Sequence, residues 1–230
     1  MLLPTIDVME QPSAAGSFAD LTVAQFVQRL SSGEPVPGGG SASAVAASLG
    51  AALISMVAAL STGKPKYAAH EATLARCGAV GKELAAQFMA LADRDADAYA
   101  GYSAALKLPR ETEPQQMVRR KAIQLAARRA ADAPWECVKA CAQLVVAAES
   151  LAGRSNVNAA SDVLVAALLG EAAARGAAEN VLINLPSTGD EDYSETMRQQ
   201  VDSALHEIAA VAARTREIVL SGQSQDPEEA

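Results

Sequence analysis

The stretch from Tyr67 to Tyr102, YAAHEATLARCGAVGKELAAQFMALADRDADAYAGY, determines the fold class. Apolar and small side chains recur along it in alternating steps of three and four residues. The series runs Tyr67, His70, Leu74, Cys77, Gly81, Leu84, Phe88, Leu91, Asp95, Ala98 and Tyr102. This spacing is typical of one face of a long α-helix that packs against other helices in a heptad-like seam. The stretch therefore predicts a long helix within a helical bundle.

Three aspartates stand at alternate positions near the end of this stretch, and they do not share a face of the helix. Asp93 and Asp97 lie on one flank, where we expect them to be solvated or to line the rim of a cleft. Asp95 is rotated about 160–200° from them, into the packing seam. Burying an unpaired carboxylate is unfavourable, so Asp95 is expected to be paired, hydrogen-bonded or protonated. Two interpretations stay open: a general acid in a cleft, or a structural aspartate held by an arginine or a backbone amide.

The composition extends the helical prediction to the whole chain. Of the 230 residues, 50% are hydrophobic but only 3% are aromatic, because alanine, valine and leucine supply the apolar content. Alanine is the best helix former, and the 15 glycines and 10 prolines are too few for a turn-rich all-β protein. We therefore expect an all-α bundle of long, Ala-rich helices. The net charge of −8 argues against nucleic acid or an anionic membrane surface as a partner.

The order of segments along the chain indicates a single domain. The expected boundaries are a flexible N-terminal segment at 1–19, a helical domain at 20–221 and a disordered tail at 222–230. Asp20 is a predicted N-cap for the first amphipathic helix. A second long helix is predicted from about residue 114 to 151, with a strongly basic first half, and Pro134 is expected to kink it.

The segment Ser41–Leu60, SASAVAASLGAALISMVAAL, carries no charge and is long enough to cross a bilayer. Two interpretations compete here, a membrane span and the central helix of a soluble bundle. We favour the soluble helix, because alanine, serine and glycine insert poorly and neither an aromatic belt nor a second apolar segment accompanies it. The N-terminus lacks the basic region of a signal peptide, so we expect a cytoplasmic protein.

Few residues in this sequence suit metal or nucleophilic chemistry. Cys77, Cys137 and Cys141 have no framework spacing, so we interpret them as free thiols or small buried hydrophobes. The two histidines, His70 and His206, belong to no cluster with metal-ligand spacing. No metal site is therefore expected, and carboxylate acid–base chemistry beside a basic rim is the best remaining candidate.

The loop PVPGGGSASA, Pro35–Ala44, is the most distinctive ligand-binding candidate. Its three glycines expose backbone amides directly before a helix, where an anion or a carbonyl oxygen binds favourably. The loop lacks the GK[ST] ending of a Walker motif and the preceding strand and glycine spacing of a dinucleotide motif. A plain tight turn remains the alternative.

These motifs together resemble the cyclodeaminase/cyclohydrolase family of tetrahydrofolate one-carbon enzymes, and the resemblance covers about residues 20 to 220. The family has PTPGGGSA where this chain has the triple-glycine loop, and TIGKKKY where it has TGKPKY at Thr62–Tyr67. The other matching segments are DADAY at Asp95–Tyr99, NVNAASD at Asn156–Asp162, NVLIN at Asn180–Asn184 and the spacing of Arg119, Gln124 and Pro134. The chain departs from the family at Ala59, Pro65, Asp97 and Tyr99.

The resemblance implies an all-α, dimer-forming fold that binds folate in a cleft. Family members cyclise 5-formiminotetrahydrofolate to 5,10-methenyltetrahydrofolate with release of ammonia, or hydrolyse methenyltetrahydrofolate to 10-formyltetrahydrofolate. Both reactions pass through a tetrahedral carbon and need only proton transfer, so no cofactor beyond the tetrahydrofolate substrate is expected. A non-catalytic folate-binding dimer is the remaining alternative.

The resemblance also implies roles for particular residues. Asp95 is the expected proton carrier, because the seam position and the family motif coincide on it. The amides of Gly38–Gly40 and the hydroxyl of Ser41 are expected to hold the pterin or the folate tail. The expected binding residues are completed by Lys64, Lys66 and Arg119 for the glutamate carboxylates, and by Tyr67, Asn156, Asn158, Ser161 and Asp162 around the ring or cleft.

Overall fold

A computed structural model describes residues 16–227 of the chain as helices joined by short turns. The α-helices are α1 (Val23–Leu30), α2 (Gly39–Ser61), α3 (Glu71–Leu106), α4 (Glu113–Leu151), α5 (Ala160–Asn184) and α6 (Glu191–Ser221). Short 3-10 helices lie at Phe18–Asp20 (η1), Pro65–His70 (η2), Val157–Ala159 (η3) and Leu185–Thr188 (η4). No β-strand occurs in the described part of the chain. The predicted all-α fold is confirmed.

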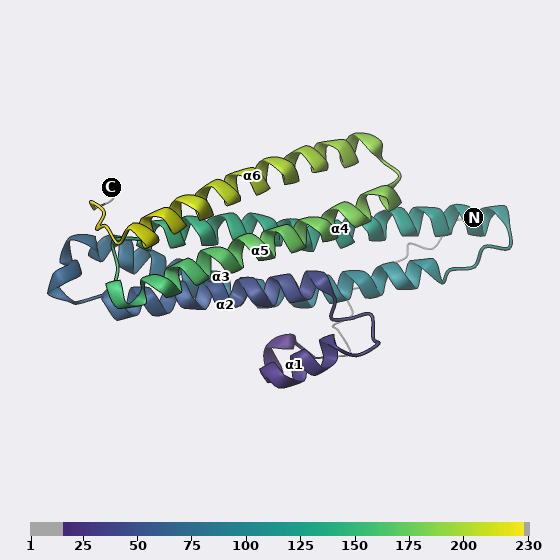
Figure 1. The fold of residues 1–230 in the computed structure, drawn as a ribbon. Helices are drawn as coiled ribbons and strands as arrows, with labels where there is room; N and C mark the ends of the chain where they lie inside the picture. The colour runs from purple at the N-terminus through teal and green to yellow at the C-terminus, as the bar shows by residue number, and fades with distance from the viewer. Residues whose placement is uncertain (1–15, 228–230) are drawn as a thin grey trace.

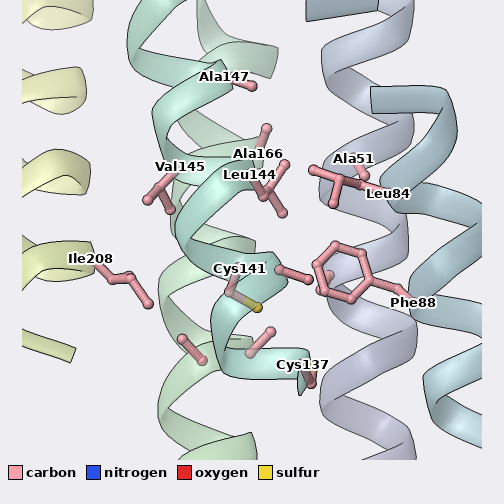
Figure 2. Packing of buried hydrophobic residues seen from close by; sticks show 14 of the residues in the cluster. Ala51, Leu84, Phe88, Cys137, Cys141, Leu144, Val145, Ala147, Ala166 and Ile208 are labelled. Carbon is pink, nitrogen blue, oxygen red and sulfur yellow. The ribbon is translucent and has the colours of Figure 1, made fainter. Parts of the chain in front are cut away.

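The five long helices run side by side in an elongated bundle, and α1 lies apart from them (Figure 1). Helices α2, α3, α4 and α5 each pack against two neighbours in a ring, and α6 covers the edge formed by α4 and α5. Figure 2 shows Leu84 and Phe88 of α3 pointing toward Cys141 and Leu144 of α4 in the middle of this bundle. All four side chains are buried.

The predicted seam of α3 is the face that enters the core. Leu74, Cys77, Leu84, Phe88 and Leu91 are all buried. The helix itself begins at Glu71, because Tyr67 and His70 belong to the 3-10 helix that starts at Pro65, after Gly63. The second long helix starts at Glu113, close to the predicted position, and a capping box of Thr112 and Gln115 fixes its start. It continues through Pro134 without a break.

The N-terminal part of the domain differs from the sequence predictions. Thr22, not Asp20, caps α1, because the Thr22 hydroxyl accepts from the Gln25 amide and the Gln25 side chain accepts from the Thr22 amide. Asp93 is not simply solvated: it accepts hydrogen bonds from the Ser17 hydroxyl (2.6 Å) and the Phe18 amide (2.8 Å). These contacts attach residues 16–19, which were expected to be flexible, to α3.

The two ends of the chain, which were expected to be flexible or disordered, lie only partly within the residues that the structure describes. Residues 1–15 and 228–230 are outside the described residues. In the described part of the tail, the Gln225 amide donates to the Gly153 carbonyl at 3.1 Å. The tail is therefore attached at that point to the turn between α4 and α5.

Two apolar helical segments, rather than one, are long enough to cross a membrane. They are Gly39–Ser61, with a mean hydropathy of 2.0, and Val157–Thr188, with a mean hydropathy of 1.4. The expectation that no second apolar segment exists is therefore wrong. Core helices of a soluble bundle pass the same test of length and composition, and α2 and α5 pack against each other here. Each is only partly covered, however, with 39% of its most apolar window buried.

Candidate active site

The first turn of α2 places the triple glycine directly against Asp95 of α3. Gly38 is the N-cap of α2 and supplies no side chain, so the amides of the first turn receive no side-chain cap. A Cβ atom on Gly40 would lie 2.6 Å from the Cγ of Asp95. Only a glycine at position 40 therefore lets the α2 backbone approach the carboxylate this closely. We call this end of the bundle the glycine end.

Ser41 joins the two helices through its hydroxyl group. Its Oγ lies 2.9 Å from Oδ2 of Asp95 and 3.1 Å from the carbonyl oxygen of Ala92, and the serine is fully buried. A hydroxyl has one hydrogen, so Ser41 donates to only one of these oxygens at a time. If Asp95 is protonated, its own O–H donates to Ser41 while Ser41 donates to Ala92. The geometry therefore accommodates both protonation states of Asp95.

The position of Asp95 changes its acid strength. Partial burial raises the pKa of the Asp95 carboxyl above its ordinary value, and hydrogen bonds from the Ser41 hydroxyl and backbone amide counter part of that rise. No arginine or lysine pairs with this carboxylate among the described residues. The described residues therefore offer no arginine partner for a structural Asp95. The contacts from Ser41, including its backbone amide, are compatible both with a structural aspartate held by an amide and with a proton carrier.

Asn180 and Asn184 of the NVLIN segment were not among the expected site residues, but Asn180 adjoins the glycine turn and Asn184 contacts Asn180. Asn180 lies beside Gly39, where an added Cβ would be 3.5 Å from its Nδ2 atom. Asn184 donates to the carbonyls of Asn180 (2.7 Å) and Ala130 (3.1 Å), and so links α5 to α4. The sequence did offer a signal for this pair. Asn180 and Asn184 are four residues apart, which places both side chains on one face of a helix.

Arg119 lies at the same end of the bundle, on the basic first half of α4. Its Nη2 and Nε atoms donate to the Leu106 carbonyl, at 3.0 and 3.3 Å, in the last turn of α3. It lines a pocket of about 460 Å³ together with Arg110, Arg120 and residues of η4. Arg119, which was expected to bind glutamate carboxylates together with Lys64 and Lys66, therefore lies at the glycine end.

The other expected binding residues lie at the opposite end of the bundle. Lys64, Lys66 and Tyr67 follow the C-terminus of α2, whose 23 residues span roughly 33 Å from its first turn. The Tyr67 hydroxyl accepts from the Val157 amide at 3.1 Å. The Asn156 amide donates to Ser61 Oγ at 2.8 Å, so the Asn156–Asp162 motif also lies there. We call this the lysine end; within one chain it does not meet the glycine end.

At the lysine end, Tyr67 is buried, Asn156 and Asp162 are partly exposed, and the other expected binding residues are accessible. Lys64, Lys66, Asn158 and Ser161 are exposed, and Lys66 Nζ lies 5.5 Å from the centre of the Tyr67 ring. Within residues 16–227, no group of three or more His, Cys, Asp or Glu side chains is arranged to hold a metal ion. The fold and site together define an all-helical protein whose glycine end holds a candidate carboxylate for proton transfer, that of Asp95.

Comparison with known proteins identifies the family. Residues 22–203 match a family model described as formiminotransferase-cyclodeaminase. The chain is 34% identical over 200 residues to a methenyltetrahydrofolate cyclohydrolase of Methylorubrum extorquens, with 87% of this chain and 96% of that protein covered. It is 35% identical over 197 residues to the formimidoyltransferase-cyclodeaminase of Rattus norvegicus, with 86% of this chain but only 36% of that longer protein covered.

A solved structure agrees with these sequence matches. The crystal structure of a formiminotetrahydrofolate cyclodeaminase from Thermotoga maritima matches with a TM-score of 0.80 and 27% identity. The match covers 88% of this chain and 98% of that one. The chain therefore belongs to the formiminotransferase-cyclodeaminase family.

Proposed function

We propose that this protein cyclises 5-formiminotetrahydrofolate to 5,10-methenyltetrahydrofolate with release of ammonia. The observation that carries the proposal is the half-buried carboxyl of Asp95, held against the glycine turn by Ser41 at 2.9 Å. The names of its relatives support the substrate class, since they act on formimino- or methenyltetrahydrofolate. No cofactor beyond the tetrahydrofolate is proposed, because proton transfer completes each step.

The proposed mechanism uses Asp95 to move one proton between two nitrogens. With the formimino nitrogen protonated, N10 of the folate attacks the formimino carbon, and the C=N double bond becomes a single bond at a tetrahedral carbon. The Asp95 carboxylate takes the proton from N10 and delivers it to the formimino nitrogen, which leaves as ammonia when its bond to carbon breaks. A raised pKa suits this role, because the carboxyl must both accept and donate near neutral pH. Asp95 ends in its starting state.

A second candidate reaction is the hydrolysis of methenyltetrahydrofolate to 10-formyltetrahydrofolate. The observation in its favour is the near-complete match, 96% of its length, to a relative named as a cyclohydrolase. Here water adds to the methenyl carbon and Asp95 takes one of its protons. Asp95 then protonates N5 as the bond between N5 and carbon breaks, and the second proton of the water leaves to solvent.

One assay distinguishes these reactions. Purified protein is offered each folate in turn, while methenyltetrahydrofolate absorbance and ammonia are followed together. Asp95→Asn is expected to lower turnover about 100-fold or more, as general acid–base groups typically contribute. Asp97→Asn, at an exposed position two residues away, is the control and should retain activity. Folate binding without turnover by the wild type would instead support a non-catalytic binding protein.

We also propose that the active form is a homodimer in which each site combines both ends of the bundle. Two copies related by a two-fold axis across the middle of α2 place their α2 helices antiparallel. The glycine end of one copy then lies near the lysine end of its partner. Such a dimer would reunite the two groups of expected binding residues that roughly 33 Å separates within one chain.

Uncovered apolar side chains on three helices support this dimer. Leu49, Met56 and Leu60 form an exposed row on α2, and Val165 and Leu168 form another on α5. On α1, which lies apart from the bundle, the exposed apolar residues are Val23, Val27 and Leu30. Rows of this kind are typical of protein interfaces. A second copy would also cover the faces that leave α2 and α5 only partly buried.

Mixing two inactive variants tests the shared site. Asp95→Asn and the double variant Lys64→Ala/Lys66→Ala are each expected to lose activity at low substrate concentration. After unfolding and refolding together, half of the dimers are mixed, and each mixed dimer carries one intact site of two. Activity should therefore recover to about a quarter of wild type. If the mixture stays as inactive as its components, the two ends do not share a site.

A further inference from the structure

The loop that carries the two lysines of the lysine end, residues 62–66, is fixed on both sides by consecutive amides from another part of the chain. We call it the lysine loop. Before it, Ser61 Oγ accepts a hydrogen bond from the Asn156 amide at 2.8 Å. After it, the Tyr67 hydroxyl accepts one from the Val157 amide at 3.1 Å. Because consecutive residues are only about 3.8 Å apart along the chain, these two contacts hold the ends of the loop close together.

The two hydroxyl groups that accept these bonds are buried. Ser61 is fully buried, and its own hydroxyl hydrogen goes to the Val57 carbonyl at 2.8 Å. Tyr67 is only 7% exposed, which leaves little of it for a ligand to contact. Its ring lies 5.5 Å from Lys66 Nζ, a separation that lets the ring attract the ammonium group. Ser61 and Tyr67 are therefore placed to shape the loop from inside the protein.

The two donor amides follow the turn at the end of α4, whose shape depends on Gly153. This residue has a φ angle of +71°, in the left-handed region that favours glycine. A Cβ atom on it would lie 2.7 Å from the carbonyl oxygen of Gln223 and 2.7 Å from Cγ of Gln225. The buried Ser155 hydroxyl donates to the Leu151 carbonyl at 2.8 Å and fixes the other side of the turn. Both the backbone conformation and the close contact therefore require glycine.

Residues 222–226, which follow α6, lie across this turn, and we call them the strap. The Gln225 amide donates to the Gly153 carbonyl at 3.1 Å. The Arg154 Nε atom donates to the Asp226 carbonyl at 2.5 Å. The strap thus contacts both residues of the turn. From there, the chain reaches the amides that hold the lysine loop within three residues.

The strap lies outside the part of the chain that matches the family. The family model covers residues 22–203, whereas the strap begins at residue 222. Its contacts are therefore a property of this chain that the family match does not supply. Ordering a chain segment costs conformational entropy, which these hydrogen bonds and the close approach to Gly153 must offset.

We propose that the strap positions the lysine loop, acting through the turn at the end of α4, and thereby sets substrate affinity at the lysine end. The inference rests on the proposed function, in which Lys64 and Lys66 bind substrate carboxylates. Gly153 and Tyr67 are positioning residues, because they hold the loop and do not contact the reacting atoms. Releasing the strap weakens substrate binding and leaves the chemical step at Asp95 unchanged.

Gly153→Ala tests the strap without requiring turnover. The added Cβ would collide with the Gln223 carbonyl at an unfavourable φ angle, so the strap should be displaced. Hydrogen exchange of the Asn156 and Lys64 amides, followed by NMR, should become about fivefold faster, the ratio expected for loss of one hydrogen bond. Gly16→Ala is the matched control, because its φ angle is +67° and no atom lies within 4 Å of the added Cβ. It should leave both exchange rates unchanged.

Kinetics connect the strap with substrate binding. Arg154→Gln keeps the glycine turn and removes only the guanidinium contact to the strap, so it serves if Gly153→Ala folds poorly. Each variant should raise KM about fivefold, as loss of one hydrogen bond predicts, and leave kcat within twofold of wild type. Tyr67→Phe, which removes only the buried hydroxyl, should also raise KM and speed exchange at Lys64. Tyr99→Phe, at a position that is 43% exposed on α3, is its control and should do neither.

The two measurements separate this inference from the proposed function. Unchanged exchange at Lys64 in both Gly153→Ala and Arg154→Gln would overturn the positioning role of the strap. Faster exchange with an unchanged KM in an active enzyme would overturn its link to substrate binding. A higher KM for Tyr67→Phe without faster exchange at Lys64 would make Tyr67 a substrate contact and overturn its positioning role. Faster exchange in a protein that turns over neither folate would support the strap and contradict the proposed reaction.

Discussion

At the residue scale, the chemistry of this protein depends on how one carboxyl group is held. Asp95 sits beside Gly40 and contacts Ser41, with no positive side chain paired to it in the described residues. Burial disfavours its charged form, and the contacts from Ser41 keep that form accessible. This balance is what a group that carries a proton in both directions requires.

Stability should depend on pH through Asp95. Its pKa is raised in the folded state, so the folded protein binds this proton more strongly than the unfolded chain. The resulting stabilisation is complete below the ordinary pKa of 3.8 and is lost as pH rises through the raised value. Denaturant titrations between pH 4 and 8 should show wild type losing stability relative to Asp95→Asn as pH increases.

That comparison has a matched control. Asp97→Asn, at an exposed position on the same helix, should not reproduce the trend seen with Asp95→Asn. If the unfolding free energies of both variants change with pH in parallel with that of wild type, the folded state does not favour protonated Asp95.

Replacing Gly40 with alanine should disturb both stability and catalysis. The added Cβ would lie 2.6 Å from Asp95 Cγ, so either the carboxyl or the first turn of α2 must move. We expect a loss of about 1–3 kcal/mol in the free energy of unfolding, as for other overpacked sites, together with reduced turnover. Gly39→Ala is the matched control for stability, because its Cβ meets Asn180 only at 3.5 Å.

At the scale of elements, close approach of α2 and α3 brings the glycine turn to Asp95. Gly81 of α3 lies so near α2 that a Cβ there would be 2.7 Å from the Ala51 carbonyl oxygen and 2.9 Å from the Ser55 amide nitrogen. Ser48 of α2 also donates to the Ala85 carbonyl of α3 at 2.9 Å. Small residues along both helices therefore set the distance between the backbones that form the site.

Gly81→Ala should separate these helices and destabilise the protein. The Ser55 hydroxyl, also 2.7 Å away, could rotate, but the Ala51 and Ser55 backbone atoms could not. The helix backbones must therefore move apart, and we expect a loss of about 1–3 kcal/mol in the free energy of unfolding. Gly101→Ala, on the same helix with open space around it, should instead stabilise by up to about 1 kcal/mol. Thermal unfolding of both variants checks the contrast. Equal effects at the two positions would contradict the close-approach argument.

At the scale of the whole molecule, our proposal requires two copies of the chain to form a complete site. Its two groups of family residues lie at opposite ends, and apolar rows on α1, α2 and α5 remain uncovered. A charge placed in such a row should disfavour a dimer, because it would be buried without a partner. The apolar faces and the divided site thus lead to the same expected quaternary structure.

Leu49→Glu should convert the dimer to a monomer and abolish turnover together. Leu49 is 56% exposed near the middle of α2, where a two-fold axis would bring two copies into contact. Sedimentation velocity should find wild type at twice the chain mass of 23.6 kDa and the variant at that mass. Met117→Glu, at an equally exposed apolar position (57%) on α4, should remain dimeric. A wild type that sediments as a monomer would contradict the proposal.

The sequence by itself determined the helical class, the long α3 with Asp95 in its seam, and the family. Helix formation depends on alanine content and on apolar side chains spaced three and four residues apart, and both are local properties of the sequence. The helices could therefore be predicted without knowing which elements become neighbours. The cap of α1 was assigned wrongly to Asp20, because Thr22 and Gln25 form a reciprocal pair that competes better for the exposed amides.

Only the tertiary structure decided which residues share a place. Asp93 proved to accept hydrogen bonds from Ser17 and Phe18, and Asn180 proved to lie beside the glycine turn. The lysine-end motif proved to lie a full helix length from Asp95. Sequence spacing fixes the face of a helix that a residue occupies. Which faces and ends meet depends instead on the packing of helices far apart in the chain, and for the proposed site on a second copy.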